Sequence, residues 1–263
     1  MAGKRDFFRN KVAVITGASS GIGEQLALAL SSYGARVVLA ARTMQKLKTL
    51  QERIAAEGHE AIAVKTDVTS EKDVEHLIRT VLERRERIDV FISNAGQYIQ
   101  GPIGNVSPDA FQTSLTVNFF ASVHAVSRLV PVMSAQGSGS IVFINSLDAK
   151  KGIIGDAPYA VAKSALDRYG EVLRQEVRDR GIHVLSVYPG RVDTPMISHI
   201  EVPAVSAKIS ARRVADAVIA GICRKKAVVT VPGPYRLLGA VNELFPRALD
   251  WVYRHLHLEG RQC

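Results

Sequence analysis

The chain has 263 residues, of which 47% are hydrophobic and 22% are charged, an ordinary composition for a globular protein with a sizeable core. It contains no run of about 18 uninterrupted apolar residues, and its N-terminus lacks the apolar segment of a secretory signal, so we expect a cytoplasmic protein. The net charge of +9 is spread along the chain without a basic stripe interleaved with aromatic residues, which argues against a nucleic-acid-binding protein.

Apolar, β-branched runs alternate with amphipathic segments along the chain. The runs predict strands at residues 11–16, 35–41, 60–66, 88–93, 139–145, 181–188 and 227–231. The segments between them predict helices at residues 23–33, 44–57, 71–84, 109–134 and 158–179. Continuous apolar runs are typical of a parallel sheet that is covered on both faces. We therefore predict an α/β fold, a Rossmann-like doubly wound sheet of about seven parallel strands in a single domain, with a core over about residues 10–232.

The stretch VAVITGASSGIGEQLALAL indicates a strand, a glycine-rich turn and a helix. Gly17, Gly21 and Gly23 stand where the backbone turns tightly, approaches a pyrophosphate and packs the helix start against the sheet. The free N–H groups of the helix N-terminus then bind the phosphate. The spacing GxxxGxG departs from the GxGxxG fingerprint, and an ordinary tight turn is the alternative. Its place between the first strand and the first helix favours a dinucleotide site.

The end of the second strand indicates which dinucleotide is bound. NAD enzymes place an acidic residue there to bind the ribose 2′-hydroxyl. This chain has no acidic residue between Glu24 and Glu52, and its strand ends with Ala41 and Arg42. A guanidinium forms charge-assisted bonds to a 2′-phosphate, which a carboxylate would repel. We predict that NADP(H) is preferred and that NAD(H) is possible, with a solvated surface arginine as the alternative for Arg42.

In the stretch APYAVAKSA, Tyr159 and Lys163 lie four residues apart after Pro158, which suits the first turn of a helix. Both side chains therefore project from one helix face. Ser146 follows a predicted strand, 13 residues before Tyr159, so its hydroxyl lies at the carboxyl end of that strand. A parallel strand and the following helix can bring the two hydroxyls to the same mouth of the sheet. Because such a pair is common on solvated helix faces, the rest of the sequence must decide.

Several motifs together resemble those of the short-chain dehydrogenase/reductase family. They are TGASSGIG (16–23), SNAG (93–96), Asn118 in VNFFAS, Ser146, YAVAK (159–163) and YPGRVDT (188–194), in the order and spacing of that family. The resemblance covers roughly residues 10–232. It implies an oxidoreductase that interconverts a small-molecule carbonyl compound and its alcohol by hydride transfer. The alternative is a non-catalytic NADP(H)-binding redox sensor of the same fold, which usually loses the tyrosine or the lysine.

The resemblance implies four catalytic residues. Tyr159 is the general acid in carbonyl reduction and the base in alcohol oxidation. A free phenol has a pKa near about 10, and Lys163 together with the positive nicotinamide is expected to lower it. Lys163 also holds the nicotinamide ribose. Ser146 donates a hydrogen bond to the substrate oxygen, and Asn118 holds a water that links Lys163 to solvent.

The resemblance also implies the cofactor contacts. They are Gly17, Ser19, Ser20, Gly21, Ile22, Gly23, Arg42, Asp67, Val68, Asn94, Ala95, Gly96, Tyr159, Lys163, Pro189, Gly190, Val192 and Thr194. Ser93 stands where the family commonly has asparagine, a modest departure. After the catalytic serine, Leu147, Asp148 and two lysines replace the small residues of the family, and this departure bears on the substrate.

A segment without clear periodicity follows the sixth strand, and its part over residues 195–209 is a candidate lid. It carries Met196, Ile197, Ile200, Val202 and Val205, with His199 as its only imidazole. The segment either covers a lipophilic carbonyl compound or packs on the core as an ordinary hydrophobic loop.

Residues 233–263 extend beyond the family core. Their apolar positions recur with helical spacing, interrupted by Pro246, at Leu237, Val241, Leu244, Phe245, Ala248, Val252 and Leu256. We expect two short helices that pack on a partner subunit or roof the pocket, with peripheral membrane attachment as the alternative. The family resemblance implies a homodimer or homotetramer built through residues 109–134 and 158–179. Cys223, Cys263 and the scattered histidines lack metal-site spacing, so we expect no metal.

Overall fold

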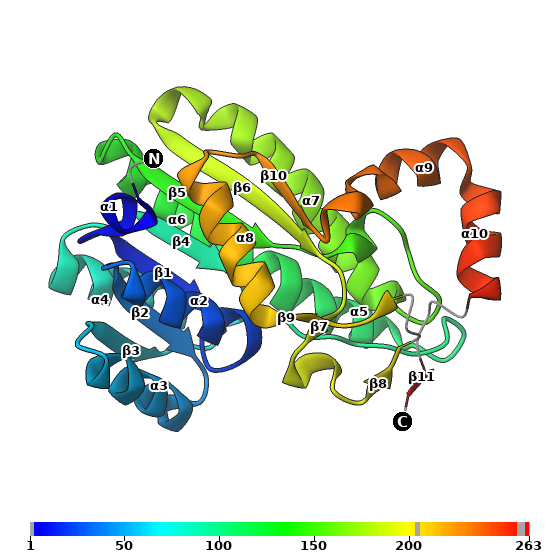
Figure 1. Cartoon of the computed structure of the whole chain (residues 1–263), viewed down its shortest axis with the longest axis horizontal. Coiled ribbons are helices and arrows are strands. Elements are labelled where there is room, and N and C mark those ends of the chain that lie inside the picture. Colours follow the sequence, from blue (N-terminus) through cyan, green and yellow to red (C-terminus); the bar gives the residue numbers. More distant parts are fainter. Residues whose placement is uncertain (1–2, 203–205, 257–260, 263) are drawn as a thin grey trace.

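The computed structural model describes residues 3–202, 206–256 and 261–262. In it, seven parallel strands form one sheet with helices on both faces (Figure 1). The strand order is β10-β6-β5-β4-β1-β2-β3. The strands are β1 (Val12–Thr16), β2 (Arg36–Ala41), β3 (Ala61–Lys65), β4 (Val90–Ser93), β5 (Gly139–Ile144), β6 (Ile182–Pro189) and β10 (Val228–Val231). Each lies within two residues of its predicted position, so the fold prediction is confirmed. Val205 and Cys263 lie outside the described residues.

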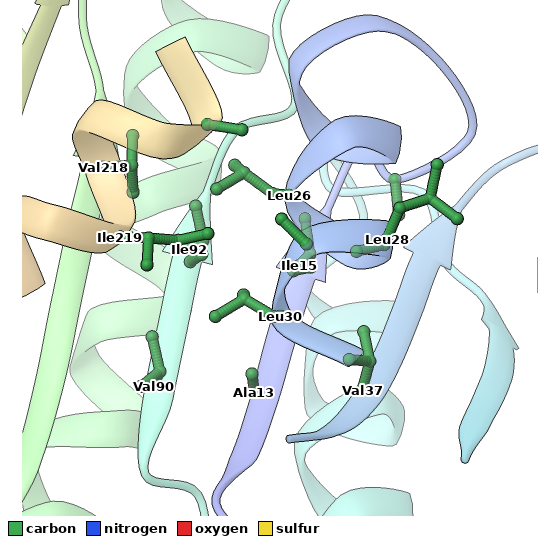
Figure 2. Close-up of a cluster of buried hydrophobic side chains, with 14 of the residues drawn as sticks. Ala13, Ile15, Leu26, Leu28, Leu30, Val37, Val90, Ile92, Val218 and Ile219 are labelled. Carbon is green, nitrogen blue, oxygen red and sulfur yellow. The ribbon is translucent and has the colours of Figure 1, made fainter. Parts of the chain in front are cut away.

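Helices cover both faces of the sheet, which explains why the strands are apolar throughout. All five residues of β1 are buried. On one face, β1 packs against α2 (Gly21–Ser32) and α8 (Ala211–Cys223), and Figure 2 shows the side chains that meet there, among them Ala13, Ile15, Leu26, Leu30 and Ile219. The other face is covered by α4 (Glu71–Arg85), α6 (Ala121–Ala135) and α7 (Ala157–Glu176).

Besides these helices and α5 (Pro108–Leu115), the described residues contain four further α-helices. They are α1 (Lys4–Phe8), α3 (Met44–Ala56), α9 (Leu238–Leu244) and α10 (Pro246–His255). Phe8 of α1 is fully buried in the same core as α2 and α8. Figure 1 shows α9 and α10 beyond the carboxyl ends of the strands, where they stand apart from the sheet.

The helix predicted over residues 109–134 is a continuous helical segment with a wider turn inside it. Its parts are α5 (Pro108–Leu115), a π-helical turn (Thr116–Phe120) and α6. By length and composition this segment could cross a membrane. In the fold, Ala125, Leu129 and Met133 of α6 are buried against the sheet, as in the core helix of a globular protein. A π-helical turn inside an α-helix frequently marks a functional site.

The candidate lid contains short regular elements. β7 (Val192–Asp193) pairs in parallel with β9 (Ile209–Ser210) and returns the chain towards α8. β8 (Ile200–Glu201) pairs antiparallel with β11 (Arg261–Gln262) near the C-terminus. The lid and the C-terminal extension are therefore joined by backbone pairing, although more than 50 residues separate them in the sequence.

The glycine-rich turn has the geometry that its sequence predicts. Gly17 and Gly21 have φ angles of +65° and +57°, in the left-handed region that favours glycine. A Cβ added to Gly23 would lie 2.3 Å from the carbonyl oxygen of Gly17 and 2.6 Å from Nδ2 of Asn94. Gly23 therefore lets the first turn of α2 pack directly on the end of β1.

We predict that Gly23→Ala destabilises the protein by about 1–3 kcal/mol, because the added methyl group overpacks a site bounded by backbone. Urea unfolding followed by circular dichroism measures the change. Gly152→Ala is the matched control, since its added Cβ meets no atom within 4 Å and its effect should stay within about 0.5 kcal/mol. Equal unfolding midpoints for the two variants would contradict the packing argument.

Candidate active site

A cavity of about 850 Å³ runs along the carboxyl edge of the sheet. It passes the ends of β1, β2, β4, β5 and β6, the edge where open α/β sheets bind their ligands. Most of the site residues predicted from the sequence line it, namely Gly17, Ser19, Ser20, Gly21, Ile22, Arg42, Asp67, Val68, Asn94, Ala95, Gly96, Ser146, Tyr159, Lys163, Pro189, Gly190, Val192 and Thr194. Gly23 and Asn118 are not part of the lining and support it from behind.

Hydrogen bonds join the glycine-rich turn to the end of β4. Nδ2 of Asn94 donates to the carbonyl oxygens of Thr16 (2.9 Å) and Gly17 (3.2 Å). Oγ1 of Thr16 accepts from the backbone N–H groups of Asn94 (3.0 Å) and Ala95 (3.1 Å). Thr16 was not singled out from the sequence. Its signal is its position as the last residue of the strand before the turn.

Two cations lie where the cavity passes the end of β2. Arg42 and Lys46 are exposed and line the cavity together with Thr43. Lys46 was not among the predicted residues, although it lies four residues after Arg42 at the start of α3. The structure thus provides a basic corner at this end of the cavity.

The adenine-edge pair Asp67 and Val68 also lines the cavity. The carboxylate of Asp67 accepts hydrogen bonds from the backbone N–H (3.0 Å) and the hydroxyl (2.8 Å) of Thr69. These bonds fix the turn that leads from β3 to α4. The contact of this pair with an adenine remains a prediction.

Lys163 connects α7 to the end of β5. Its Nζ donates to the carbonyl oxygen of Ile144 (2.9 Å) and lies 5.6 Å from the centroid of the Tyr159 ring. The residue is 4% exposed. Burial lowers the pKa of Lys163 to about 8, against the opposing effect of the nearby Asp148 carboxylate.

Tyr159 differs from the expectation drawn from the sequence. Within the protein itself, burial has the largest effect on the pKa of the Tyr159 phenol and raises this pKa above its ordinary value. The carboxylates of Asp148 and Asp156 raise this pKa further, while a hydrogen bond with Ser146 lowers it. The expected lowering of this pKa by Lys163 is not found in the protein alone, where burial and the two carboxylates raise the pKa. A phenol with a raised pKa stays protonated at neutral pH.

Asn118 lies in the π-helical turn and is 1% exposed. Its Oδ1 accepts from the backbone N–H of Gln97 (3.1 Å), and its Nδ2 donates to the carbonyl oxygens of Gln97 (2.8 Å) and Ser114 (3.1 Å). These bonds position the segment that follows β4. The side chain thus has a positioning role, and the water relay inferred from the resemblance remains a prediction.

Two carboxylates, those of Asp148 and Asp156, lie beside the Tyr159 phenol, although nothing in the sequence indicated that they meet. Asp156 is 2% exposed and accepts at Oδ1 from the hydroxyl of Tyr98 (2.5 Å) and from Nε2 of Gln100 (3.1 Å). Burial raises the pKa of Asp156 to about 6. Burial, together with the charge of Asp156, raises the pKa of Asp148 to about 7. The ring of Tyr98 contacts that of Tyr159 edge to face, with centroids 5.1 Å apart.

The unusual loop after Ser146 connects the site to its surroundings. Leu147 and Asp148 line the cavity. Lys150 donates to Asp167 Oδ2 (2.6 Å) on α7, and Lys151 forms an ion pair with Asp250 on α10. The two lysines therefore fix the loop to α7 and to the C-terminal extension.

The lid and the extension form the wall of the cavity farthest from the sheet. From the lid, Met196, Ile197 and Ile200 line it, whereas His199 is exposed. The extension contributes Tyr235, Leu238, Leu249, Val252 and Tyr253. The inner face of the extension therefore roofs the cavity, as one of the sequence-based alternatives proposed.

The apolar stripe predicted for the extension does not form a single face, because the chain turns between α9 and α10. Val252 faces the cavity, whereas Leu237, Val241, Leu244 and Phe245 are exposed, Leu244 to 72%. Trp251, which was not part of the predicted stripe, is 60% exposed. We call Leu237, Val241, Leu244, Phe245 and Trp251 the outer row.

Known proteins with similar sequences fall into one family. A family model described as short chain dehydrogenase matches residues 11–203. An uncharacterized oxidoreductase of Listeria monocytogenes is 36% identical over 194 residues, which are 73% of this chain and 78% of that protein. The ketoacyl reductase HetN of Nostoc sp. is 31% identical over 253 residues, which are 93% of this chain and 88% of that protein.

A solved structure agrees with these relatives. The crystal structure of a variant of actinorhodin polyketide ketoreductase with NADPH is similar with a TM-score of 0.79 at 28% identity, over 91% of this chain and 99% of that one. The matched residues contain the glycine-rich turn, Ser146, Tyr159 and Lys163. The chain therefore belongs to the short-chain dehydrogenase/reductase family of oxidoreductases.

Proposed function

We propose that the protein is an NADP(H)-dependent oxidoreductase that interconverts a carbonyl compound and its alcohol, with Tyr159 as the general acid and base. One observation carries this proposal: Ser146, Tyr159 and Lys163 line the same cavity as the glycine-rich turn. A proton donor and a dinucleotide-type cradle thus share one space. NADPH in the similar ketoreductase structure supports the choice of cofactor.

The residues along the cavity fit a nicotinamide dinucleotide. The left-handed glycines and the N-terminus of α2 leave backbone N–H groups open to a pyrophosphate, and a Cβ at Gly17 would lie 2.8 Å from Cα of Ala95. Pro189, Gly190 and Thr194 would hold the nicotinamide end. The bound cofactor supplies hydride in reduction and accepts it in oxidation.

The chain's own residues handle the proton. In reduction, the neutral phenol of Tyr159 donates its proton to the substrate oxygen; its raised pKa keeps the phenol protonated until then but makes it a weaker acid. Ser146 stabilises the charge that develops on that oxygen with a hydrogen bond. Lys163 places a buried ammonium beside the ring. The phenolate that remains would be stabilised by this ammonium together with the positive charge of an oxidised nicotinamide, which the protein alone does not supply.

The effect of one substitution on turnover distinguishes an enzyme from the alternative, a redox sensor without turnover. We predict that Tyr159→Phe lowers kcat at least about 100-fold, because general acid catalysis is lost. Binding of NADPH, followed by fluorescence, should stay within about threefold of wild type. Tyr169→Phe on the same helix is the control, since that ring packs on Phe119 and Phe143. Retained turnover in Tyr159→Phe would overturn the assigned role.

The basic corner supports NADP(H) over NAD(H). We predict that replacing both Arg42 and Lys46 by alanine raises KM for NADPH at least about tenfold, because two cations that can bind the 2′-phosphate are lost. KM for NADH should hardly change. Arg36→Ala, at the other end of β2, is the matched control. Equal wild-type KM values for NADPH and NADH would refute the preference.

The cavity wall indicates the kind of substrate. Ile153, Met196, Ile200, Leu249 and Val252 give it a large apolar surface, which supports a lipophilic carbonyl compound. We further propose a homodimer or homotetramer built through α5–α6 and α7. The exposed apolar residues Phe120, Val161 and Val172 on these helices support it.

The outer row is flanked by Arg236, Arg247 and Arg254, all of them exposed. An apolar face with a basic rim suits an anionic membrane surface, and we propose peripheral attachment there, with a partner subunit as the alternative.

We predict that the wild-type protein sediments with phosphatidylglycerol vesicles and that a variant with Leu244→Glu and Trp251→Glu does not. Both side chains are exposed, so the fold should persist. Ile103→Glu, at a site outside the outer row that is 77% exposed, is the control and should sediment like wild type. Wild-type protein that stays in the supernatant would exclude membrane attachment.

A further inference from the structure

Asp148 lies two residues after Ser146, in the 3-10 turn Leu147–Ala149 that Ser146 caps. The backbone N–H of Asp148 donates to Ser146 Oγ (3.2 Å). Ser146 Oγ in turn donates to Oδ2 of Asp148 (3.1 Å). Ser146, Asp148 and Tyr159, the proposed general acid, line one cavity. The hydroxyl of Ser146 is therefore already bound to the Asp148 carboxylate at the place where we propose that it serves a substrate oxygen.

The hydrogen-bonding capacity of a serine hydroxyl makes the Asp148 carboxylate and a substrate oxygen compete for its single proton. The group has one proton and two lone pairs. One lone pair accepts from the N–H of Asp148, and the proton goes to the carboxylate. A substrate oxygen then finds no proton on Ser146. If Asp148 is instead a carboxylic acid, it can donate to the second lone pair, and the serine proton becomes free for the substrate.

We propose that Asp148 is a positioning residue that acts through Ser146: as a carboxylic acid it orients the serine proton towards the substrate oxygen, and as a carboxylate it withdraws that proton. The proposal rests on the proposed function, because it takes Ser146 as a donor to a substrate oxygen.

The surroundings of Asp148 allow both forms near neutral pH. Burial and the charge of Asp156 raise the pKa of Asp148 to about 7, while Ser146, Arg191 and Lys163 act in the opposite direction. The other titratable groups that face it are Tyr98, Tyr159 and Tyr253. The neighbouring Lys150 and Lys151 form ion pairs with Asp167 and Asp250.

The pKa of Asp148 sets the pH dependence that we expect for carbonyl reduction. Below pH 7, Asp148 is mostly protonated and Ser146 can serve the substrate. Above pH 7, the protonated fraction falls about tenfold per pH unit, and kcat/KM for carbonyl reduction should fall with it. Lys163, with a pKa of about 8, titrates close by and could produce a similar decline.

The variant Asp148→Asn shows whether Asp148 or Lys163 causes the alkaline decline, because the two groups predict shifts of the decline in opposite directions. An amide can donate to Ser146 Oγ and does not ionise, so the alkaline decline should move up by at least about one pH unit or disappear. The Asp148 carboxylate raises the pKa of Lys163, so its removal lowers that pKa. A decline that moves to lower pH would therefore assign it to Lys163 and overturn the proposal, as would an unchanged profile.

Asp156→Asn is the matched variant. Both hydrogen bonds of Asp156 end on Oδ1, which asparagine retains, so the local structure should persist. Losing the neighbouring charge lowers the pKa of Asp148, and the decline should move to lower pH, opposite to Asp148→Asn. Shifts in the same direction for both variants would contradict the proposal. Should Asp148→Asn fail to fold by circular dichroism, Asp148→Ser is expected to give the same upward shift.

A measurement that does not depend on turnover distinguishes the proposed role of Asp148 from the proposed function of the protein. Carboxyl ¹³C NMR of the full chain, with Asp148 assigned through Asp148→Asn, reports its titration directly. Ser146→Ala removes a donor to the carboxylate and should raise the pKa of Asp148 by about one unit. No change would overturn the proposal even in an active enzyme. A Ser146-dependent titration in a protein without turnover would instead refute the proposed function and leave the proton competition in place.

Discussion

The hydrogen bonds between Asn94 and the end of β1 are the constraint on which the whole site depends. They join the glycine-rich turn to the end of β4, the strand that pairs with β1. Gly23 adds to this junction, because α2 can approach β1 so closely only where a Cβ is missing. The glycine-rich turn and the side chains of Ser146, Tyr159 and Lys163 thereby lie along one continuous edge of the sheet.

Burial sets the chemistry at the substrate end of this edge. It disfavours charge on every group, so it lowers the pKa of Lys163 and raises those of Tyr159, Asp148 and Asp156. The pKa values of Lys163, Asp148 and Asp156 thereby move towards neutral pH, and the phenol of Tyr159 stays uncharged. Small changes of pH or of one neighbouring charge can then decide which atom holds a proton.

The loop after Ser146 links this chemistry to the outer wall. Its carboxylate bonds to the serine, and its two lysines bind α7 and α10. The extension and the lid, paired through β8 and β11, complete an apolar wall above the phenol. The apolar cavity wall, the hydrogen bonds between Ser146 and Asp148 and the exposed outer row therefore belong to one connected part of the molecule.

The sequence by itself predicted the seven strands and the glycine-rich turn, because these depend on local periodicity and short spacings, and its resemblance to a family singled out Ser146, Tyr159 and Lys163. It did not reveal the π-helical turn at Asn118, the meeting of Asp148 with Asp156, or the exposure of His199. Nor did it give the raised pKa of Tyr159, which was expected to be lowered. Tertiary structure alone decided these features, since burial, charge proximity and the direction of a side chain depend on segments that are distant in the sequence.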